Sequence, residues 1–246
     1  MLKLLLSGAS GTTGRAVAAL VHADERFVLA GQASQSQFFP ADVEADVIVD
    51  FSHPDLLART LDFAMRRRLP LVTGTTGTGP EFESLLEQAA EQIPICRAAN
   101  FSVGVTLLCR LVEQAAGILG EEFDAEISEI HHRRKLDAPS GTALALGQAV
   151  ARGRGRSLDQ IEVLDRSRER RPRQSGELGI QALRGGDVVG DHTVFFLGDA
   201  ERLEFTHRAA DRTLFARGAL IAAARLPGYQ PGLVDFERLL FPDPLV

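Results

Sequence analysis

Short apolar runs that end in glycine-rich or hydroxyl-rich turns dominate the first hundred residues of the chain. The first run, residues 2–6, leads into a glycine turn at residues 8–14, and a pattern with helical periodicity follows at 15–22. A strand, a glycine turn and a helix in this order are typical of a dinucleotide-binding unit. The spacing Gly-x-x-Gly-x-x-Gly is a variant of the usual motif, and a purely structural glycine turn is the alternative interpretation.

The alternation of strand and helix continues to about residue 102. The pattern predicts strands at 27–31, 46–51, 69–72 and 93–96 and helices at 55–68 and 81–91. This order predicts an α/β fold with a Rossmann-like, doubly wound parallel sheet. Turns at 8–14, 73–77 and 98–102 follow three of the strands. Because ligands bind at the carboxyl ends of strands in such sheets, we expect a nucleotide site there.

The second half of the chain has a different pattern. A long helix is predicted at 103–119 and a strand at 123–130. Alternating segments at 178–183, 188–197 and 202–207 predict strands of a second, α+β domain with an open mixed or antiparallel sheet. Residues 152–173 hold eight arginines, which favours a solvated, partly mobile loop over a specific anion site. A last helix is predicted at 212–225, and a proline-rich tail follows.

Composition narrows the classes of protein that fit. The chain has 246 residues, 45% of them hydrophobic and 24% charged, as in ordinary globular proteins. Its net charge of −6 argues against a nucleic-acid partner. No apolar run approaches the roughly 18–20 residues needed to span a bilayer, and residues 2–6 are too short for a signal peptide, so we expect no membrane association. Cys96 and Cys109 lie in apolar segments and indicate reduced thiols in a cytoplasmic protein.

The densest group of reactive side chains lies between the strand at 123–130 and the helix that begins near Ser140. His131, His132 and Lys135 precede a Ser-Gly-Thr turn, and Lys135 is one of only two lysines in an arginine-rich chain. A lysine amine can give up its proton where an arginine cannot. A helix start also presents unpaired N–H groups to anions. These features favour proton transfer and anion binding over a solvated basic loop.

A metal centre is not expected at this motif. Paired histidines are also found as metal ligands, but no cysteine or carboxylate lies at a convincing ligand spacing around His131 and His132. We therefore predict no metal site.

The run from Glu129 to Leu144 resembles the signature of the 4-hydroxy-tetrahydrodipicolinate reductase family, also called dihydrodipicolinate reductases, of the diaminopimelate route to lysine. Further similarity lies along the whole chain, at 8–14, 46–54, 74–77, 98–102, 186–193 and 206–212. The resemblance implies NAD(P)H-dependent reduction of 4-hydroxy-tetrahydrodipicolinate, a small cyclic dicarboxylate, to tetrahydrodipicolinate.

The resemblance also implies residue roles. His131 looks like the catalytic acid–base histidine, and Lys135 looks like the proton-donating lysine. The implied substrate contacts are His132, Ser140, Gly141 and Thr142. The implied cofactor contacts are Gly8, Ala9, Ser10, Gly11, Thr12, Thr13, Gly74, Thr75, Thr76, Ala98, Ala99, Asn100 and Phe101.

The architecture implied by the resemblance has two domains. Residues 1–102 and 212–246 would form the dinucleotide-binding domain. Residues 103–211 would form a substrate-binding and tetramerisation domain, whose open sheet joins subunits into a homotetramer.

Two departures from the family concern the cofactor. Ser34 and Gln35 stand where many members have an acid, or an acid and an arginine, at the end of the second strand. Thr12 stands where some members have a basic residue in the glycine turn. An acid at the end of the second strand would hold the ribose of NADH and repel a 2′-phosphate. We therefore predict that NADPH and NADH both serve, with NADPH at least as good, and that Arg15 or Arg26 is a candidate phosphate contact.

Two other functions are alternatives. The first alternative is a different two-domain dehydrogenase, of the homoserine or aspartate-semialdehyde type. The semialdehyde type needs a nucleophilic cysteine, and neither Cys96 nor Cys109 lies in a polar turn that would activate a thiol. A non-catalytic NAD(P)-binding sensor is the other, and it predicts no turnover of reduced cofactor.

Overall fold

The computed structural model describes residues 1–77, 79–167 and 170–241. The chain divides into two compact units. Unit 1 comprises Met1–Val103 and the residues from Arg212 onward, and unit 2 comprises Gly104–Asp211. Among the described residues, no helix has both the length and the apolar character needed to cross a membrane.

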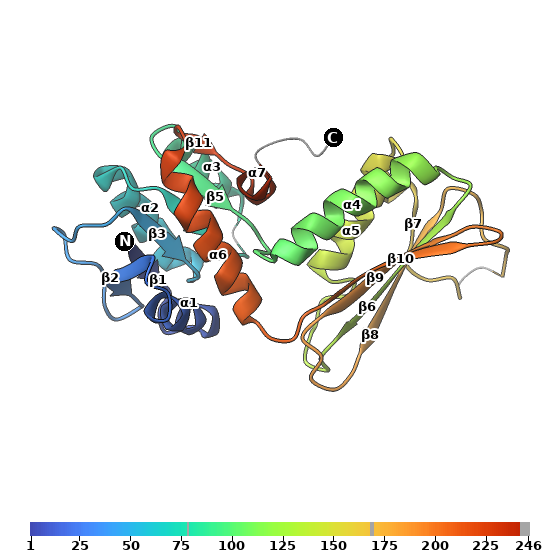
Figure 1. The fold of residues 1–246 in the computed structure, drawn as a ribbon, viewed down its shortest axis with the longest axis horizontal. Coiled ribbons are helices and arrows are strands. Elements are labelled where there is room, and N and C mark those ends of the chain that lie inside the picture. The colour runs from blue at the N-terminus through green and yellow to red at the C-terminus, as the bar shows by residue number, and fades with distance from the viewer. Residues whose placement is uncertain (78, 168–169, 242–246) are drawn as a thin grey trace. The chain divides into compact units, whose positions relative to one another are not determined.

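Unit 1 is built on a six-stranded parallel sheet with the strand order β11-β5-β4-β3-β1-β2 (Figure 1). Its strands are β1 (Leu2–Ser7), β2 (Phe27–Ala33), β3 (Val47–Asp50), β4 (Leu71–Thr73), β5 (Pro94–Arg97) and β11 (Gly232–Leu233). Its helices are α1 (Thr12–His22), α2 (Pro54–Arg67), α3 (Pro80–Ala90), α6 (Thr213–Arg225), α7 (Phe236–Leu240) and the 3₁₀ turn η2 (Leu226–Gly228). The predicted Rossmann-like parallel sheet is confirmed.

The apolar runs of unit 1 have a simple cause. All four residues of β3 are buried, and so are residues 4–7 of β1, because helices cover both faces of the sheet. Leu4 and Leu6 pack with α1, α6 and α7 in one cluster. Leu5 belongs to a second cluster with α2 and α3. The carboxyl ends of the central strands are thereby fixed by a core on either side.

Unit 2 is built on a five-stranded mixed sheet with the order β10-β9-β6-β8-β7. β6 is antiparallel to β9 and parallel to β8, so the predicted second α+β domain with an open mixed sheet is confirmed. The strands are β6 (Asp124–His131), β7 (Glu162–Val163), β8 (Leu178–Arg184), β9 (Asp191–Leu197) and β10 (Arg202–Arg208). The helices are α4 (Val103–Leu119), α5 (Gly141–Gly153) and the 3₁₀ turn η1 (Leu158–Gln160).

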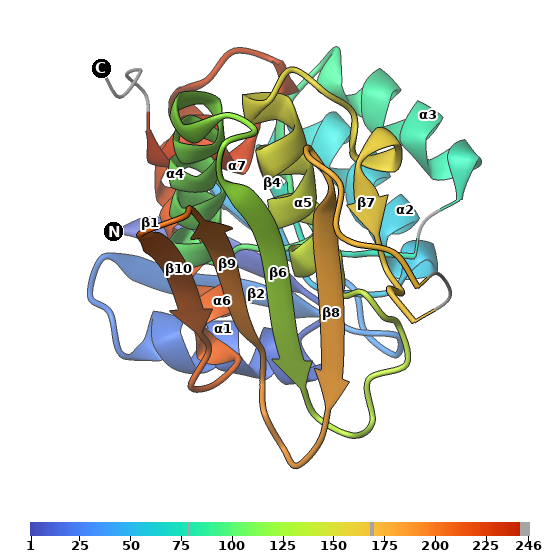
Figure 2. The same ribbon diagram turned by 90° about the vertical axis from the view of Figure 1, so that its right-hand side faces the viewer.

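The sheet of unit 2 has one covered face and one open face. Helices α4 and α5 pack on one face and form a single apolar cluster with it. The strands β6, β8, β9 and β10 present the other face to the viewer in Figure 2, with α4 and α5 behind them. The central strand β6 alternates strictly between half-buried and buried positions. Its buried positions are Ala125, Ile127, Glu129 and His131, so two polar side chains end an otherwise apolar row.

The structure differs from the sequence predictions in one strand start and in several short elements that were not predicted. β9 begins at Asp191, not at 188, because residues 188–190 belong to the turn from β8. The predicted tail contributes β11, which extends the first sheet beside β5, and the short helix α7. Residues 158–163, expected to lie in a loop, form the turn η1 and the edge strand β7.

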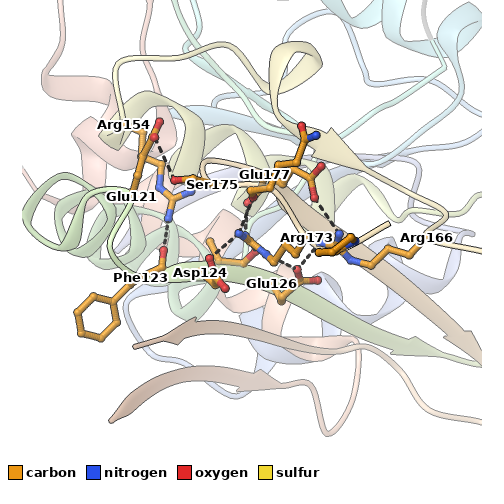
Figure 3. Close-up of polar contacts among 12 residues, drawn as sticks. Glu121, Phe123, Asp124, Glu126, Arg154, Arg166, Arg173, Ser175 and Glu177 are labelled. Carbon is orange, nitrogen blue, oxygen red and sulfur yellow. Dashed lines mark hydrogen bonds and ion pairs between the residues drawn. The ribbon is translucent and has the colours of Figure 1, made fainter. Parts of the chain in front are cut away.

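The arginine-rich segment is also more ordered than the predicted solvated loop. Figure 3 shows Arg166 and Arg173 bridging acids of β6 and of the turn before β8. Arg166 contacts Glu126 at 2.5 Å and Glu177 at 2.8 Å, and Arg173 contacts Asp124 at 2.5 Å. The hydrogen bond from Arg166, supported by that from Arg171, outweighs burial and lowers the pKa of Glu177 to about 2. The prediction of a solvated loop is therefore wrong for Arg166 and Arg173, because acids 40 or more positions away in sequence pair with them. Residues 168 and 169 lie outside the described part of the chain.

Candidate active site

The reactive part of unit 2 begins at the carboxyl end of β6, where Glu129 and His131 lie two residues apart on the buried face. The His131 imidazole Nδ1 is hydrogen-bonded to the Glu129 Oε2. Arg184, at the end of the neighbouring strand β8, donates to both oxygens of Glu129 at 2.9 Å. The same guanidinium donates to the Asp137 carbonyl at 2.6 Å. The sheet thus fixes a buried Arg184–Glu129–His131 chain of charge-assisted hydrogen bonds.

Ser140 links this chain to the start of α5. Its backbone N–H donates to the Glu129 Oε1 at 3.0 Å. Its hydroxyl accepts the Ala143 N–H at 3.2 Å and so caps the helix, as the Ser-Gly-Thr turn predicts. The hydroxyl also bonds the His192 Nε2 from β9 at 3.1 Å. The helix N-terminus is therefore held against the same carboxylate that holds His131.

His131 is closely enclosed. Its ring lies at 75° to the His192 ring, with centroids 5.0 Å apart, and its side chain is 10% exposed. A Cβ atom at Gly190 would come 2.9 Å from the His131 Nε2. Only a glycine at position 190 leaves room for the ring in this position.

Lys135 lies in the loop between β6 and α5. Its Nζ donates to both carboxylate oxygens of Asp137 at 2.9 Å, and its side chain is 21% exposed. This pairing lowers the pKa of Asp137. The turn after β8 braces the loop, since Arg133 N donates to the Gly186 carbonyl at 3.2 Å. The structure thus brings Lys135 into the loop that joins the His131 strand to the helix start.

The remaining predicted substrate contacts lie beside these groups. His132 and Thr142 are half-buried, and Gly141 is exposed as the first residue of α5. A Cβ at Gly141 would meet nothing within 4 Å, so the helix start is open on that side.

The charge states of the cluster follow from its surroundings. Burial raises the pKa of Glu129, but the hydrogen bonds from Arg184, His131 and Ser140 outweigh it and leave that pKa below its ordinary value. Burial, followed by the charge of His131, lowers the pKa of His192 to about 4. Near neutral pH the cluster therefore contains an ionised Glu129 and an uncharged His192.

The same residues have the geometry of a possible cation site. Ligand atoms of Glu129, His131 and His192 lie within 4.8 Å of one another in the described part of the chain. In this structure the carboxylate is already bonded to Arg184, His131 and Ser140. A guanidinium on both oxygens competes with a metal ion, so we assign the cluster to proton chemistry.

In unit 1 the glycine turn has the shape of a phosphate cradle. Gly8 has φ 79°, and a Cβ there would lie 2.2 Å from the Phe51 carbonyl oxygen. A Cβ at Gly14 would lie 2.1 Å from the Gly8 carbonyl oxygen. Both positions therefore need glycine, one for conformation and both for close approach. Ser10, Gly11 and Thr12 are exposed on this turn, where α1 begins, and Ala9 and Thr13 are half-buried.

The other turns lie at the same edge of the sheet, at the ends of β4 and β5. Asp50 is fully buried and accepts from the hydroxyls of Thr73 at 2.8 Å, Thr75 at 2.6 Å and Ser52 at 2.5 Å. Thr75 is therefore committed to shaping its turn, while Thr76 is exposed beside it. A Cβ at Gly74 would lie 2.2 Å from the Phe51 ring.

The turn after β5 offers mainly its backbone. Ala98 N donates to the Thr73 carbonyl at 3.2 Å, and Ala98, Ala99 and Asn100 are exposed or half-buried. The Phe101 ring is 1% exposed and packs between Phe51 and Phe236. Phe101 is thus a core residue that shapes this turn, and its carbonyl oxygen packs against Gly218 of α6.

The end of β2 carries the predicted hydroxyl and amide groups. Ser34 is half-buried and Gln35 exposed; Ser34 N donates to the Gln37 carbonyl at 2.8 Å. Of the two candidate arginines, Arg26 precedes β2 and pairs with Asp24 at 2.6 Å, so it lies at the opposite edge of the sheet. Arg15 lies in the first turns of α1 and donates to the Ser10 carbonyl of the glycine turn.

Sequence reasoning missed several residues of these clusters. The sequence places Glu129 and His192 only within motifs and Asp50 only within a strand, and nothing in it singles out Arg184. The signal available for Glu129 was its period-two spacing from His131 on a strand with a buried face. Arg184 and His192 lie 55 and 52 residues from their partners, and no local pattern places them.

Unit 1 has a glycine cradle at the carboxyl edge of a parallel sheet, and unit 2 has a buried histidine–carboxylate pair in an α+β fold. This combination is typical of a two-domain, nicotinamide-dependent oxidoreductase. The family can be stated as well. Residues 2–101 match the model "Dihydrodipicolinate reductase, N-terminus" and residues 104–240 match "Dihydrodipicolinate reductase, C-terminus". The chain belongs to the dihydrodipicolinate reductase family.

Individual proteins agree with this assignment. A 4-hydroxy-tetrahydrodipicolinate reductase from Pseudomonas fluorescens is 47% identical over 197 residues, which cover 80% of this chain and 74% of that protein. A dipicolinate-bound dihydrodipicolinate reductase from Paenisporosarcina sp. TG-14 has a TM-score of 0.75 at 22% identity, covering 96% of this chain and 97% of that one. A DAP dehydrogenase from C. glutamicum, in complex with DAP, has a TM-score of 0.54 at 15% identity, covering 99% and 97%. The two structural likenesses concern the fold.

Proposed function

We propose that unit 2 binds the substrate and supplies the proton, and that unit 1 binds the cofactor, in the reduction of 4-hydroxy-tetrahydrodipicolinate to tetrahydrodipicolinate. Membership of the family makes the chain an NAD(P)H-dependent reductase of lysine and diaminopimelate biosynthesis. In the balanced reaction water leaves as the hydroxyl group together with a proton from the neighbouring carbon. A hydride is then added to the carbon that carried the hydroxyl, and a proton to the neighbouring carbon. The observation that carries the division of roles is the Glu129–His131 pair, bonded through Ser140 to a helix start.

The substrate would be held by its two carboxylates. The α5 start at Gly141 is exposed, and the N-terminus of a helix favours an anion. Thr142, the next residue, is the proposed second contact there. Lys135 is the second anchor, because its ammonium already holds a carboxylate, that of Asp137. His132 lies three residues before Lys135 in the sequence and completes the proposed contacts. The dipicolinate of the Paenisporosarcina protein has the same two-carboxylate chemistry.

The proton would come from His131. When bound, the reduced nicotinamide supplies the hydride. The glycine cradle fits its pyrophosphate because Gly8 and Gly14 let the turn pack closely against the Phe51 carbonyl and against itself at the start of α1. His131 holds a proton on Nδ1 against Glu129, so Nε2 is the atom that delivers a proton to the carbon next to the one reduced. Lys135 supports this step as a second proton donor.

We propose that NADPH and NADH are both accepted, with NADPH at least as good. The loop from Gln32 to Gln37 carries no carboxylate, so a 2′-phosphate meets no repulsion at the end of β2. Ser34 and Gln35 offer neutral hydrogen bonds to it. Arg15 of α1, which donates to the Ser10 carbonyl of the adjoining glycine turn, is the cation that supports phosphate binding there.

The open face of the unit 2 sheet would form the subunit interface of a homotetramer. Ile130, Leu183 and Phe195 lie on this face, and Leu183 is 50% exposed. An apolar face of this kind is stabilised when a second copy covers it. The free thiols of Cys96 and Cys109 suit the reducing cytoplasm, where we place the enzyme.

A paired cofactor assay tests the function. The oxidation of NADPH and of NADH is followed separately in the presence of 4-hydroxy-tetrahydrodipicolinate. We expect both to be oxidised, with kcat/KM for NADPH equal to or above that for NADH. Absence of oxidation of either cofactor would favour the sensor alternative, and a strong preference for NADH would contradict the role given to the Ser34 loop.

A further inference from the structure

Glu129 is an unusual residue for the buried face of a strand. It is 0% exposed, and an ionised carboxylate at such a position is stable only when hydrogen-bonded or paired. Each of its oxygens has two partners. Oε2 is bonded to the His131 Nδ1 and to the Arg184 Nη1, and Oε1 to the Ser140 N and the Arg184 Nη2.

The two oxygens serve two different parts of the site. One holds the proton-bearing imidazole at the end of β6. The other holds the residue that caps α5, immediately before the helix start proposed to bind a substrate carboxylate. The bidentate guanidinium of Arg184 fixes the plane of the carboxylate and so the direction of both bonds. A shift of Glu129 would move the proton donor and the anion site together.

The other charged and titratable groups around His131 do not duplicate this role. His192 on β9 faces its ring and is uncharged near neutral pH, and His207 on β10 lies beyond His192. Arg184 on β8 and Lys135 in the loop are cations, and Asp137 is committed to Lys135. Glu129 is therefore the group that bonds the imidazole with a negative oxygen.

We propose that Glu129 is the positioning residue of this active site: its carboxylate, held by Arg184, orients His131 with Nε2 as the delivering atom and aligns the α5 start for the substrate. The proposal rests on the function proposed above for His131. A carboxylate on Nδ1 stabilises the protonated imidazole and fixes which nitrogen faces the reaction. Glu129 touches neither substrate nor cofactor and acts through its neighbours.

Glu129→Gln tests the proposal with little change in volume. The amide cannot accept from His131, Ser140 and Arg184 together. We expect kcat to fall by roughly 10–100-fold, as when the carboxylate partner of a functional histidine is lost. We also expect the alkaline limb of the rate profile to move to lower pH, and the KM for dicarboxylate substrate to rise, while the KM for NADPH stays unchanged.

A matched control lies on the same strand. Glu126 is also held by two arginines, Arg166 and Arg173, but on the opposite face of β6. Glu126→Gln should leave kcat, the pH profile and both KM values near those of the native enzyme, even where it lowers the melting temperature. If Glu129→Gln does not fold, Arg184→Lys keeps the charge but loses the bidentate contact that fixes the plane of the carboxylate. It should raise the KM for dicarboxylate substrate and lower kcat by less than Glu129→Gln does. Native kinetics in either folded variant would overturn the proposal.

A double-mutant cycle separates this proposal from the function on which it rests. In a His131→Ala background, Glu129→Gln should lower kcat by far less than in the native enzyme, because the two residues act as a unit. An equal loss in both backgrounds would show that Glu129 acts independently of His131 and would overturn the proposal alone. Native kcat in His131→Ala itself would remove the proton donor assignment and this proposal with it.

Discussion

Acidification should destabilise the folded chain through His192, and the size of the effect can be worked out. This histidine is buried between strands and bonds the Ser140 hydroxyl at 3.1 Å. Burial first, and the neighbouring charge of His131 second, lower its pKa from the ordinary 6.5 to about 4. Between these two values the unfolded chain binds a proton that the folded chain does not. Stability must therefore fall as the pH falls through this window.

The magnitude follows from the width of the window. One pH unit of differential protonation corresponds to about 1.4 kcal/mol. Near pH 7 the residue is unprotonated in both states, and by pH 5 it is protonated almost only in the unfolded state. Lowering the pH by roughly 1.5 units below the ordinary pKa of 6.5 therefore reduces the free energy of unfolding by about 2 kcal/mol through this one residue.

The assay compares the native protein with His192→Gln. The free energy of unfolding is measured by urea denaturation at pH 7 and at pH 5, with circular dichroism as the signal. Loss of the Ser140 hydrogen bond lowers the stability of the variant at both pH values, but its decrease between them should be smaller than that of the native protein by about 2 kcal/mol. The same decrease in both proteins would refute the reasoning, because His192 would then not be held unprotonated by the fold.

Three further predictions concern the site, the cofactor and the assembly. Lys135→Arg keeps the charge but removes a transferable proton, so kcat should fall roughly 10²-fold while affinity for dipicolinate, measured by calorimetry, changes less; native kcat would exclude Lys135 from proton transfer. Ser34→Asp should raise the KM for NADPH relative to that for NADH, and an unchanged ratio would remove this loop from cofactor selection. Light scattering should give about four times the 26.6 kDa chain mass, and Leu183→Glu on the open sheet face should yield smaller species; a stable native monomer would contradict the interface.

Much of the fold could be predicted because its signals are local. Unbroken apolar runs such as residues 47–49 arise where helices cover both faces of a parallel sheet. The Ser-Gly-Thr turn predicts the start of α5 because a capping serine accepts a hydrogen bond from the backbone N–H only three residues further along the chain. The glycine turn could be predicted as well, because Gly8 and Gly14 are required by close contacts within one loop and with the end of a neighbouring strand.

The partners of the reactive residues could not be predicted in the same way. The bond from Arg184 to Glu129 depends on the parallel register of β6 and β8, which sets His131 opposite Arg184 across 53 residues. The arginine-rich segment looked solvated because its partners, Asp124 and Glu126, lie on a strand far away in sequence. Glu126 and Glu129 lie on opposite faces of β6, as their spacing indicates, but the arginines that hold each of them could be identified only from the structure.

The most direct test of the account is the turnover of His131→Ala with 4-hydroxy-tetrahydrodipicolinate and NADPH, measured together with the affinity of the variant for dipicolinate. His131 is bonded to Glu129, the carboxylate that also holds Arg184 and the residue that caps α5. We predict a fall in kcat of roughly 10²–10⁴-fold, with dipicolinate still bound at an affinity near that of the native enzyme. A variant that keeps the native kcat would contradict the assignment of proton transfer to this site.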